Sequence, residues 1–329
     1  MTFLYIIIAL VLIFDFINGF HDSANSIATV VSTRVLSPLA AVALAASFNF
    51  IAFLVFELNV AKTIGKGVID PEIVNLSLIA AAVTAAIIWN LLTWWWGLPS
   101  SSSHTLVGGL VGAAVAASGF GSVIYSGVLK IALFIIVAPV LGMVMSYIIS
   151  IVVLHIVKHS SPFAVDKHFR RLQLLSASAF SLGHGGNDAQ KSMGIIWVAL
   201  VAVGKVSVDS DPALWIVLSC HAAIALGTLF GGWRIVKTMG QKITKLKPFE
   251  GFCAETAGAL TLFMATNLGI PVSTTHTITG SIIGAGATKR ASAVKWGVTG
   301  KIFWAWILTI PVSALIGGVM YYFFRILFG

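Results

Sequence analysis

Apolar runs that are too long for a soluble domain fill most of this 329-residue chain. Hydrophobic residues make up 58% of it and charged residues 9%, whereas a soluble domain carries about 25% charged residues. This excludes an ordinary soluble enzyme and a disordered protein. Because the runs do not alternate as the strands of a membrane barrel do, they favour membrane helices. The runs extend approximately over residues 3–17, 38–56, 75–96, 104–117, 128–157, 172–182, 192–204, 213–233, 251–268, 273–287 and 297–328.

Several of these runs are too short to cross a membrane, since spanning about 30 Å of hydrocarbon takes roughly 20 helical residues. The pieces around residues 18–26 and 183–191 become long enough only if each joins its neighbours as one interrupted span. The sequence therefore predicts an all-α polytopic membrane protein with about 10–12 transmembrane segments and broken or re-entrant helices. About five crossings fall on each side of residue 158.

The chain has 20 basic and 11 acidic residues, and the basic ones gather in short loops between apolar runs. In a soluble protein this excess would suggest a nucleic acid partner, but here it fits the bias of cytoplasmic loops, so we expect no nucleic acid. With residues 158–171 placed inside, thirteen basic residues face the cytoplasm and five face outside. We therefore expect a multi-pass protein of the cell (inner) membrane, embedded in the lipid bilayer, with both termini extracytoplasmic.

Two pairs of matching motifs divide the chain into halves. The matched segments are Asn18–Ser26 with His184–Ser192, at an offset of 166 residues, and Gly97–Thr105 with Gly269–Thr277, at an offset of 172. These matches predict a first repeat over 1–157, a cytoplasmic connecting loop over 158–171 and a second repeat over 172–329. An odd number of crossings in each half makes the repeats inverted, and paired interrupted segments in inverted halves are typical of a transporter site near the midplane.

Asp22 and Asp188 are equivalent acids in apolar surroundings. An ionised carboxylate in hydrocarbon costs roughly 2.5–3.5 kcal/mol to insert, so intramembrane acids usually face a cavity and act there. Each could instead only cap a broken helix. We favour a site for a coupling cation or proton. Asp22 and Asp188 are also possible ligands of a co-transported divalent metal. The neighbours expected around it are His21, Asn25, His184, Asn187 and Gln190. Asp15 and Glu255 are further acids in apolar runs.

Two Ser/Thr-His-Thr segments each follow a Gly-x-Pro sequence and precede an apolar, glycine-rich run. Pro and Ser/Thr are residues that start helices, so hydroxyl and free N–H groups should gather there at a helix N-terminus, which binds anions. Simple N-capping is the alternative. Two such termini brought together would surround a tetrahedral oxyanion. The candidate binding residues are Ser101, Ser102, Ser103, His104, Thr105, Ser273, Thr274, Thr275, His276 and Thr277.

Lys191 breaks the symmetry of the repeats, because the first half has Asn25 at the matching position. It follows Asp188 by three residues, which is within ion-pair reach on a helix. It either keeps Asp188 charged in a buried ion pair, or supplies an ammonium group that occupies a cation position or contacts the anion. Either interpretation argues against a sodium site in this half.

These motifs resemble those of the inorganic phosphate transporter (Pit/PiT) family. Asn18–Asn25 and Gly185–Asp188 resemble its two signature repeats, and Gly97–Thr105 resembles its Ser-His-Thr segment. The resemblance implies secondary transport of inorganic phosphate into the cell, in a homodimer. We therefore expect no enzymatic activity, and we expect the hydroxyl-rich segments and Lys191 to bind the phosphate. Phe20-His21-Asp22 is similar to the bacterial proton-coupled branch, which carries phosphate as a neutral metal–phosphate complex. The sodium-coupled branch has Asn in place of Lys191.

We therefore expect a symporter of inorganic phosphate, or of neutral metal–phosphate, that is driven by protons and holds no cofactor. Because an acidic site repels phosphate, Asp22 and Asp188 must be protonated or paired with a cation when phosphate is bound, and this requirement couples the two. H⁺ is the expected co-transported ion, with Na⁺ or divalent Mg²⁺, Ca²⁺ or Zn²⁺ as alternatives. A sodium-coupled phosphate transporter, a sulfate transporter and an uncoupled anion channel also fit the fold. An intramembrane aspartyl protease that uses both acids is a remote alternative, because it leaves the Ser/Thr-His-Thr segments unexplained.

Overall fold

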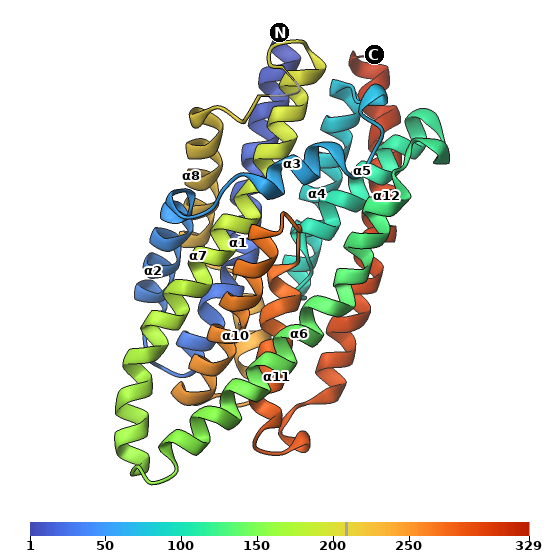
Figure 1. Cartoon of the computed structure of the whole chain (residues 1–329). Helices are drawn as coiled ribbons and strands as arrows, with labels where there is room; N and C mark the ends of the chain where they lie inside the picture. The colour runs from blue at the N-terminus through green and yellow to red at the C-terminus, as the bar shows by residue number, and fades with distance from the viewer. Residues whose placement is uncertain (208–209, 329) are drawn as a thin grey trace.

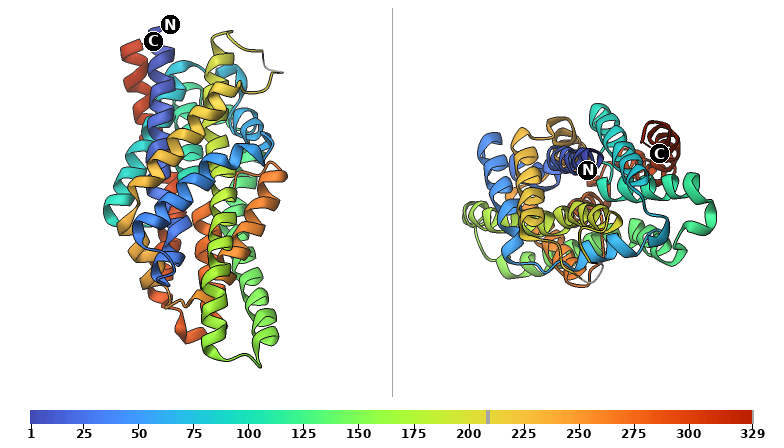
Figure 2. Two further views of the ribbon diagram at one scale, coloured as in Figure 1. Left: turned by 90° about the vertical axis from the view of Figure 1, so that its left-hand side faces the viewer. Right: turned by 90° about the horizontal axis from the view of Figure 1, so that it is seen from above.

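The computed structural model describes residues 1–207 and 210–328 as an elongated bundle of helices (Figure 1). Apart from the helices, an isolated antiparallel bridge joins Ile69 and Val123. The expected all-α architecture is confirmed. The N-terminus and the last described residues lie at the same end of the bundle, where the rings of Phe3 and Phe328 stack with their centroids 4.1 Å apart (Figures 1 and 2). We call this the terminal end and the other the basic end.

Four long helices form the frame of the bundle. They are α1 (Thr2–Ser32), α6 (Tyr125–Val157), α7 (Pro162–Ala202) and α12 (Trp296–Phe328). At 1.5 Å per residue, each is longer than the hydrocarbon core is thick. The helices α1 and α6 run from the terminal end to the basic end, and α7 and α12 run back (Figure 1). The second half of the chain is therefore inverted relative to the first.

Two helical hairpins enter the frame from opposite ends (Figure 1). One consists of α4 (Leu76–Trp96) and α5 (Ser102–Ser118), and the other of α10 (Pro248–Asn267) and α11 (Thr274–Ala287). Gly97 and Gly269 end the first arms in the left-handed region, at φ +66° and φ +64°, where a residue without Cβ is not strained. A proline two residues later prevents the helix from continuing. The chain therefore turns back inside the bundle at these two tips and not at residues 18–26 and 183–191, where the sequence predicted the interruptions.

The other segments are shorter and discontinuous. In the first half, α2 (Pro38–Ile51), η1 (Ala52–Leu54) and α3 (Asn59–Lys66) follow one another. In the second, α8 (Leu214–Phe230) is bent by 61° against α9 (Trp233–Lys237) and the π-helical turn η4 (Thr238–Lys242). Single turns occur in three loops, at η2 (Pro71–Ile73), η3 (Phe120–Ser122) and η5 (Ala291–Ala293).

The two halves interlock rather than lie side by side. The second arm of each hairpin packs against the last long helix of the other half, α5 on α12 and α11 on α6. The first long helix of each half likewise packs across, α1 on α8 and α7 on α2. The equivalent contacts on both sides are those expected of an inverted repeat.

The apolar core consists of two clusters with polar sequence between them. On α1, one cluster ends at Phe14 and the other begins at Ala24. On α7, the cluster that includes Ala24 ends at Phe180, and the cluster that includes Phe14 continues from Ala189. Both signature motifs therefore lie at the boundary between the clusters, deep in the bundle.

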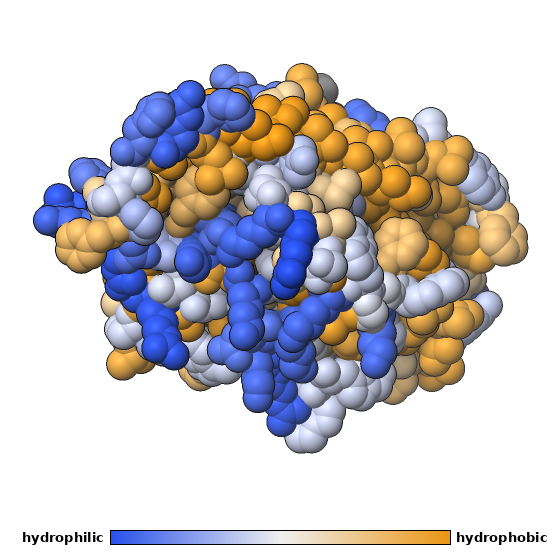
Figure 3. Space-filling view, turned by 90° about the horizontal axis from the view of Figure 1, so that it is seen from below, coloured by the Kyte–Doolittle hydropathy of each residue, from blue (hydrophilic) through white to orange (hydrophobic). Residues whose placement is uncertain are grey.

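The surface agrees with a membrane protein that has one basic end. Leu129, Leu133 and Ile136 of α6 are each more than half exposed, which presents an apolar face to lipid. Figure 3, which views the basic end, shows hydrophilic side chains gathered there beside apolar flanks. The turn between α6 and α7 lies at this end (Figure 1).

By length and composition alone, α1, α4, α6 and α12 of the described residues are able to span a membrane, and α8 with its bent continuation is a fifth. The expected 10–12 segments also include shorter or more polar helices, such as α7, which carries a signature motif. Two details of the sequence prediction were wrong. The predicted connecting loop 158–171 is mostly helical: the N-cap Ser161 accepts a hydrogen bond from the Ala164 amide, and α7 begins at Pro162.

The second error concerns the signature motifs, which do not interrupt their helices. The helices α1 and α7 continue through 18–26 and 183–191. Their polar side chains bond to other helices, so the backbone keeps its own hydrogen bonds and no unwound carbonyl groups are available there.

Candidate functional site

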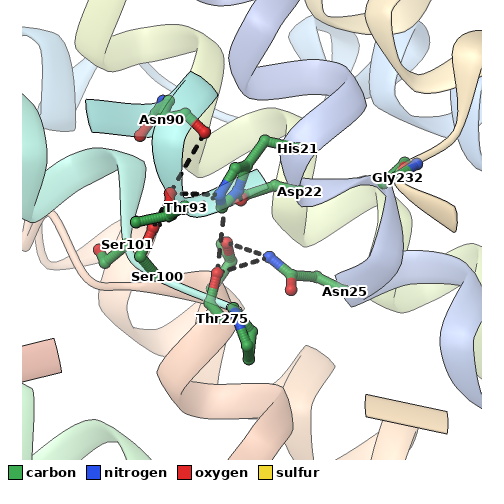
Figure 4. Close-up of polar contacts among 12 residues, drawn as sticks. His21, Asp22, Asn25, Asn90, Thr93, Ser100, Ser101, Gly232 and Thr275 are labelled. Atoms are coloured by element: carbon green, nitrogen blue, oxygen red, sulfur yellow. Dashed lines mark hydrogen bonds and ion pairs between the residues drawn. The ribbon is translucent and has the colours of Figure 1, made fainter. Parts of the chain in front are cut away.

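The two signature motifs and the two hairpin tips meet in a buried polar centre. Figure 4 shows the part of it around the first motif. Its ionisable side chains are almost inaccessible: Asp22 is 2% exposed, Asp188 1% and Lys191 2%. The tips themselves touch, because the rings of His104 and His276 have centroids 4.9 Å apart. The predicted meeting of the two hydroxyl-rich segments in the protein interior is thus what the structure contains.

The acid of the first half, Asp22, is held by a histidine of its own motif and by a hydroxyl of the opposite hairpin (Figure 4). His21 Nδ1 lies 2.5 Å from Asp22 Oδ1, and Thr275 Oγ1 donates to Asp22 Oδ2 at 3.4 Å. The other ring nitrogen of His21, Nε2, lies 3.1 Å from Thr93 Oγ1 and 3.4 Å from Ser100 Oγ. The basic side chain beside this acid is therefore an imidazole ring, which is charged only when it is protonated.

The acid of the second half, Asp188, is paired with an ammonium group. Lys191 Nζ lies 2.5 Å from Asp188 Oδ1, as the three-residue spacing predicted. It also donates to the Val272 carbonyl at 3.0 Å and to Ser103 Oγ. The three N–H donors of the ammonium group are therefore all used. The remaining oxygen of this acid, Asp188 Oδ2, lies 3.3 Å from His184 Nε2.

Hydroxyls at the start of α11 connect the two acids. Asn25 Nδ2 donates to Thr274 Oγ1 at 3.2 Å and to Thr275 Oγ1 at 2.9 Å. Thr274 in turn donates to Asp188 Oδ2 at 3.4 Å. Since Thr275 donates to Asp22, one hairpin tip bonds to both signature helices.

The other members of the two hydroxyl-rich segments build the tips. Ser101 and Ser273 are the N-caps of α5 and α11, and each accepts the backbone N–H three residues on at 3.2 Å. Thr105 and Thr277 donate to the carbonyl four residues before them, at 2.8 Å and 2.9 Å. The predicted helix starts are confirmed, but these four side chains are committed to their own helices. The hydroxyl of Ser102 has no hydrogen-bond partner in the described part of the chain.

Three groups at the centre are arranged so that they can hold a cation. One ligand atom from each of Asp22, His184 and Asp188 lies within 4.8 Å of the others, and all three residues are buried. His184 Nδ1 lies 3.1 Å from Asn49 Oδ1, and the amide nitrogen of Asn49 donates to Thr228. His184 therefore donates through Nδ1, which leaves the Nε2 lone pair directed at a carboxylate. A proton or a metal ion between them would relieve that repulsion.

Comparison with known proteins identifies the family. A model of the phosphate transporter family matches the chain twice, over residues 18–166 and 158–317. The chain belongs to this family. A relative from Rhizobium meliloti (strain 1021) is 59% identical over 316 residues, which are 96% of this chain and 95% of the relative. One from Bacillus subtilis (strain 168) is 44% identical over 330 residues, covering 100% and 98%. Each is named a probable low-affinity inorganic phosphate transporter.

A solved structure extends the likeness to the fold. A protein described as "The sodium-dependent phosphate transporter" matches with a TM-score of 0.89 and 27% sequence identity, over 99% of this chain and all of that one. The family members found are transporters, which supports the expectation that this chain is not an enzyme.

Two residues expected beside the coupling site instead support the surrounding helices. Gln190 Oε1 accepts the backbone N–H of Val60 at 2.9 Å, and its amide nitrogen donates to the Glu57 carbonyl, so it caps the start of α3. Asn187 donates to Thr266 Oγ1 at 3.0 Å near the end of α10, and its own oxygen is unpaired in the described structure. In the described part of the chain, neither side chain forms a hydrogen bond with Asp22 or Asp188.

The sequence analysis missed three polar neighbours of the site. Thr93 and Ser100 bond to His21, and Asn49 bonds to His184. Thr93 and Asn49 are polar residues within apolar runs, and each is fully buried. That pattern is a usable signal, because a polar group at membrane depth needs a partner.

Proposed function

We propose that this chain carries inorganic phosphate across the cell membrane together with protons, by alternating access around the buried centre. The observation that carries the proposal is the pair of unlike acids. Asp188 already has a permanent counter-charge in Lys191, whereas Asp22 has only the titratable His21. A proton on the first pair therefore sets the charge of the centre, and with it the repulsion that phosphate meets.

Donor counting supports a proton on the His21–Asp22 pair. Thr93 Oγ1 donates its single hydrogen to the carbonyl groups of its own helix, at 2.9 Å from Trp89 and 3.2 Å from Asn90. It can therefore only accept from His21 Nε2. If Nε2 carries a hydrogen, a neutral ring has a bare Nδ1, and two acceptors cannot lie 2.5 Å apart. A proton on either His21 or Asp22 satisfies this contact.

The phosphate would bind between the hairpin tips. The hydroxyls of Ser102, Ser103, Thr274 and Thr275, with the first N–H groups of α5 and α11, supply donors and the favourable end of two helix dipoles. Lys191, whose ammonium group donates to Ser103, adds a positive charge. All five side chains are at most 4% exposed, so phosphate reaches them only when the bundle opens. Inverted repeats supply equivalent opening movements toward the two ends.

Uptake by proteoliposomes under imposed gradients tests this proposal. We expect an inwardly directed proton gradient without sodium to drive phosphate above its equilibrium level, and excess sulfate to compete poorly. Sulfate would compete poorly because it keeps no proton near neutral pH to donate to an acidic acceptor. Uptake driven by a sodium gradient and indifferent to pH would refute proton coupling. Equal competition by sulfate would refute the assignment of the substrate.

A metal–phosphate complex is a second candidate substrate. The observation that favours it is the clustering of Asp22, His184 and Asp188, whose ligand atoms suit a divalent ion. In this case removal of Mg²⁺, Ca²⁺ and Zn²⁺ by a chelator abolishes uptake, and His184→Gln weakens the response to added metal. Uptake that is unchanged by chelation would leave free phosphate as the substrate.

The orientation, membrane and assembly also belong to the proposal. The basic end faces the cytoplasm of the inner membrane, both termini are outside, and the chain is a homodimer. The support for the orientation is the basic bias of residues 158–171, 234–247 and 289–295. Cysteines introduced at Ser160 and at Thr2 should be labelled by impermeant reagents from the cytoplasmic and the outer side, respectively. Crosslinking in membranes should give a product of two chains.

A further inference from the structure

Asp15 is a third buried acid near the centre, and the proposed mechanism does not use it. It is 0% exposed and lies on α1, seven residues before Asp22 on the side of the terminal end. Seven residues make nearly two helical turns, so both carboxyl groups project from the same face of α1. Asn18, 2% exposed, lies between them on this face.

No ion pair balances a negative charge on Asp15 among the described residues. Among the described residues, neither of its carboxylate oxygens has a hydrogen-bond partner. Ser192 of α7 and Cys220 of α8 lie beside it, and Asp188 and Lys191 of α7 are the charged groups that act on it. The three donors of Lys191 are used by other partners. The helices α2 and α4, which also pack on α1, contain no ionisable side chain.

The remaining elements that pack on α1 present their ionisable groups elsewhere. His221, the other ionisable residue of α8, directs Nδ1 at the Asn49 carbonyl. Lys289 forms an ion pair with Glu250 of α10, and Glu255 accepts hydrogen bonds from Gln173 and Ser176. On α9, the guanidinium of Arg234 donates to the Trp95 carbonyl. In α11, the ring of His276 stacks on Trp306.

A carboxylate without a counter-charge is strongly disfavoured in a protein interior, whereas a carboxylic acid is neutral and needs only an acceptor for its hydrogen. The Ser192 hydroxyl beside Asp15 has an acceptor oxygen for that hydrogen. Toward an ionised Asp15, this hydroxyl and the Cys220 thiol are neutral donors and supply no charge. Protonation of Asp22 or Asp188 would weaken an ion pair, but protonation of Asp15 breaks no contact. Asp15 is therefore the acid best suited to gain and lose a proton in the cycle.

We infer that Asp15 is a second proton-binding site, at which a bound proton is required for the terminal end to close over the phosphate site. Ionised Asp15 needs water and therefore favours a conformation open toward that end. When a proton from the water on that side binds to the carboxylate, the side chain can be buried as it is in this structure. The inference rests on phosphate being the transported substrate, but it does not require proton-driven accumulation. Asp15 touches no substrate and acts through the conformational equilibrium.

Exchange of labelled phosphate across proteoliposomes, at equal pH on both sides, tests the inference. A required proton lowers the exchange rate of the natural chain by up to about tenfold per pH unit on the alkaline side. Asp15→Asn is permanently neutral, so its ratio to the natural chain should rise with pH by the same factor. Comparison at each pH removes the effect of the titration of phosphate itself. Asp15→Glu should restore the pH dependence of the natural chain.

The matched control is Ser181→Ala, because Ser181 is the repeat-related position, is 0% exposed and bonds only within its own helix, to the Ala177 carbonyl. It should keep the natural pH profile. An Asp15→Asn profile parallel to that of the natural chain would overturn the inference, as would a folded Asp15→Asn that exchanges no phosphate at any pH. If the Asn variant does not fold, Asp15→Leu must show the same insensitivity to pH, and failure to do so overturns the inference as well. A natural chain that exchanges no phosphate would instead refute the proposed function.

Discussion

The two signature helices share a backbone plan but give their acids unlike partners. In α1, Asp22 lies 2.5 Å from a histidine nitrogen, whereas in α7 Asp188 lies 2.5 Å from a lysine ammonium group. Each acid also accepts from a threonine at the tip of the hairpin α10–α11. Lysine side chains are normally charged near neutral pH and histidine side chains titrate there, and the proposed proton coupling depends on this difference between the two halves.

The packing around the acids, by contrast, is nearly the same in both halves. Gly19 and Gly185 are related by the repeat, and each allows another helix to approach closely. A Cβ at Gly19 would lie 2.2 Å from the Ile224 carbonyl oxygen, and one at Gly185 would lie 2.5 Å from that of Asn49. The repeat thus keeps its scaffold symmetrical, while the residues that carry charge have diverged.

The largest expected effect comes from breaking the ion pair of Asp188 with Lys191. Asp188→Asn leaves the Lys191 ammonium buried without its counter-charge, which costs about 3–5 kcal/mol in comparable ion pairs. Asp22→Asn should cost clearly less, because His21 can lose its proton and become neutral. Unfolding in detergent measures both. Equal losses from the two variants would contradict the distinction between the halves. The double variant Asp188→Asn/Lys191→Met should recover most of the stability but no phosphate uptake.

A second substitution makes the two halves alike. Lys191→Asn places in α7 the residue that α1 has at the matching position, Asn25. It leaves Asp188 beside His184 with room for a small cation, so we expect phosphate uptake to be several-fold lower without sodium and to rise when sodium is added. The natural chain, measured in parallel, should not respond to sodium. A variant that ignores sodium would show that the ammonium group does not occupy a cation position.

The symmetrical packing predicts a smaller and equal effect. Gly19→Ala and Gly185→Ala each force a methyl group against a backbone carbonyl, and overpacking of this kind costs about 1–3 kcal/mol. Gly300→Ala is the control, because a Cβ there meets no described atom within 4 Å and alanine favours a helix more than glycine does. Its stability should be unchanged or slightly higher. A large difference between Gly19→Ala and Gly185→Ala would show that the packing is not equivalent.

The smallest effect should come from the threonines that bond to their own helices. Thr105→Val and Thr277→Val remove hydroxyls that donate to Ser101 and Ser273 carbonyl groups, so the KM for phosphate should stay within about twofold. Thr275→Val removes the hydroxyl between Asn25 and Asp22, so it should raise the KM for phosphate by more than twofold. Initial uptake rates distinguish them. A larger effect at Thr105 than at Thr275 would reassign the binding groups.

The sequence predicted the parts of the site that follow from local patterns. The repeat paired Asp22 with Asp188, Gly-x-Pro-Ser predicted helix starts at the tips, and the spacing of Lys191 predicted its ion pair. Motif positions alone, however, could not distinguish a broken helix from a continuous one. Polar sequence at 18–26 stays helical because its partners come from distant segments, such as Thr93 and Thr275.

The same limit explains the candidates whose position differs from the expectation. Gln190 follows Asp188 by two residues, so it points to another side of the helix and caps α3. Ser101 and Thr105 have the right chemistry for an anion, but local backbone groups use them first. Which hydroxyls stay available is decided by tertiary contacts, such as the bond of Ser103 to Lys191 from the other half.

A structure determined with phosphate bound is the most direct test of the central claim that the two hairpin tips and the two unlike acids form one substrate site. The account predicts density for a tetrahedral anion within about 3 Å of the Ser103 and Thr275 hydroxyls, with Lys191 as its nearest positive charge. Density outside the contact between the hairpins, with Lys191 and both hydroxyls bonded as they are here, would contradict it.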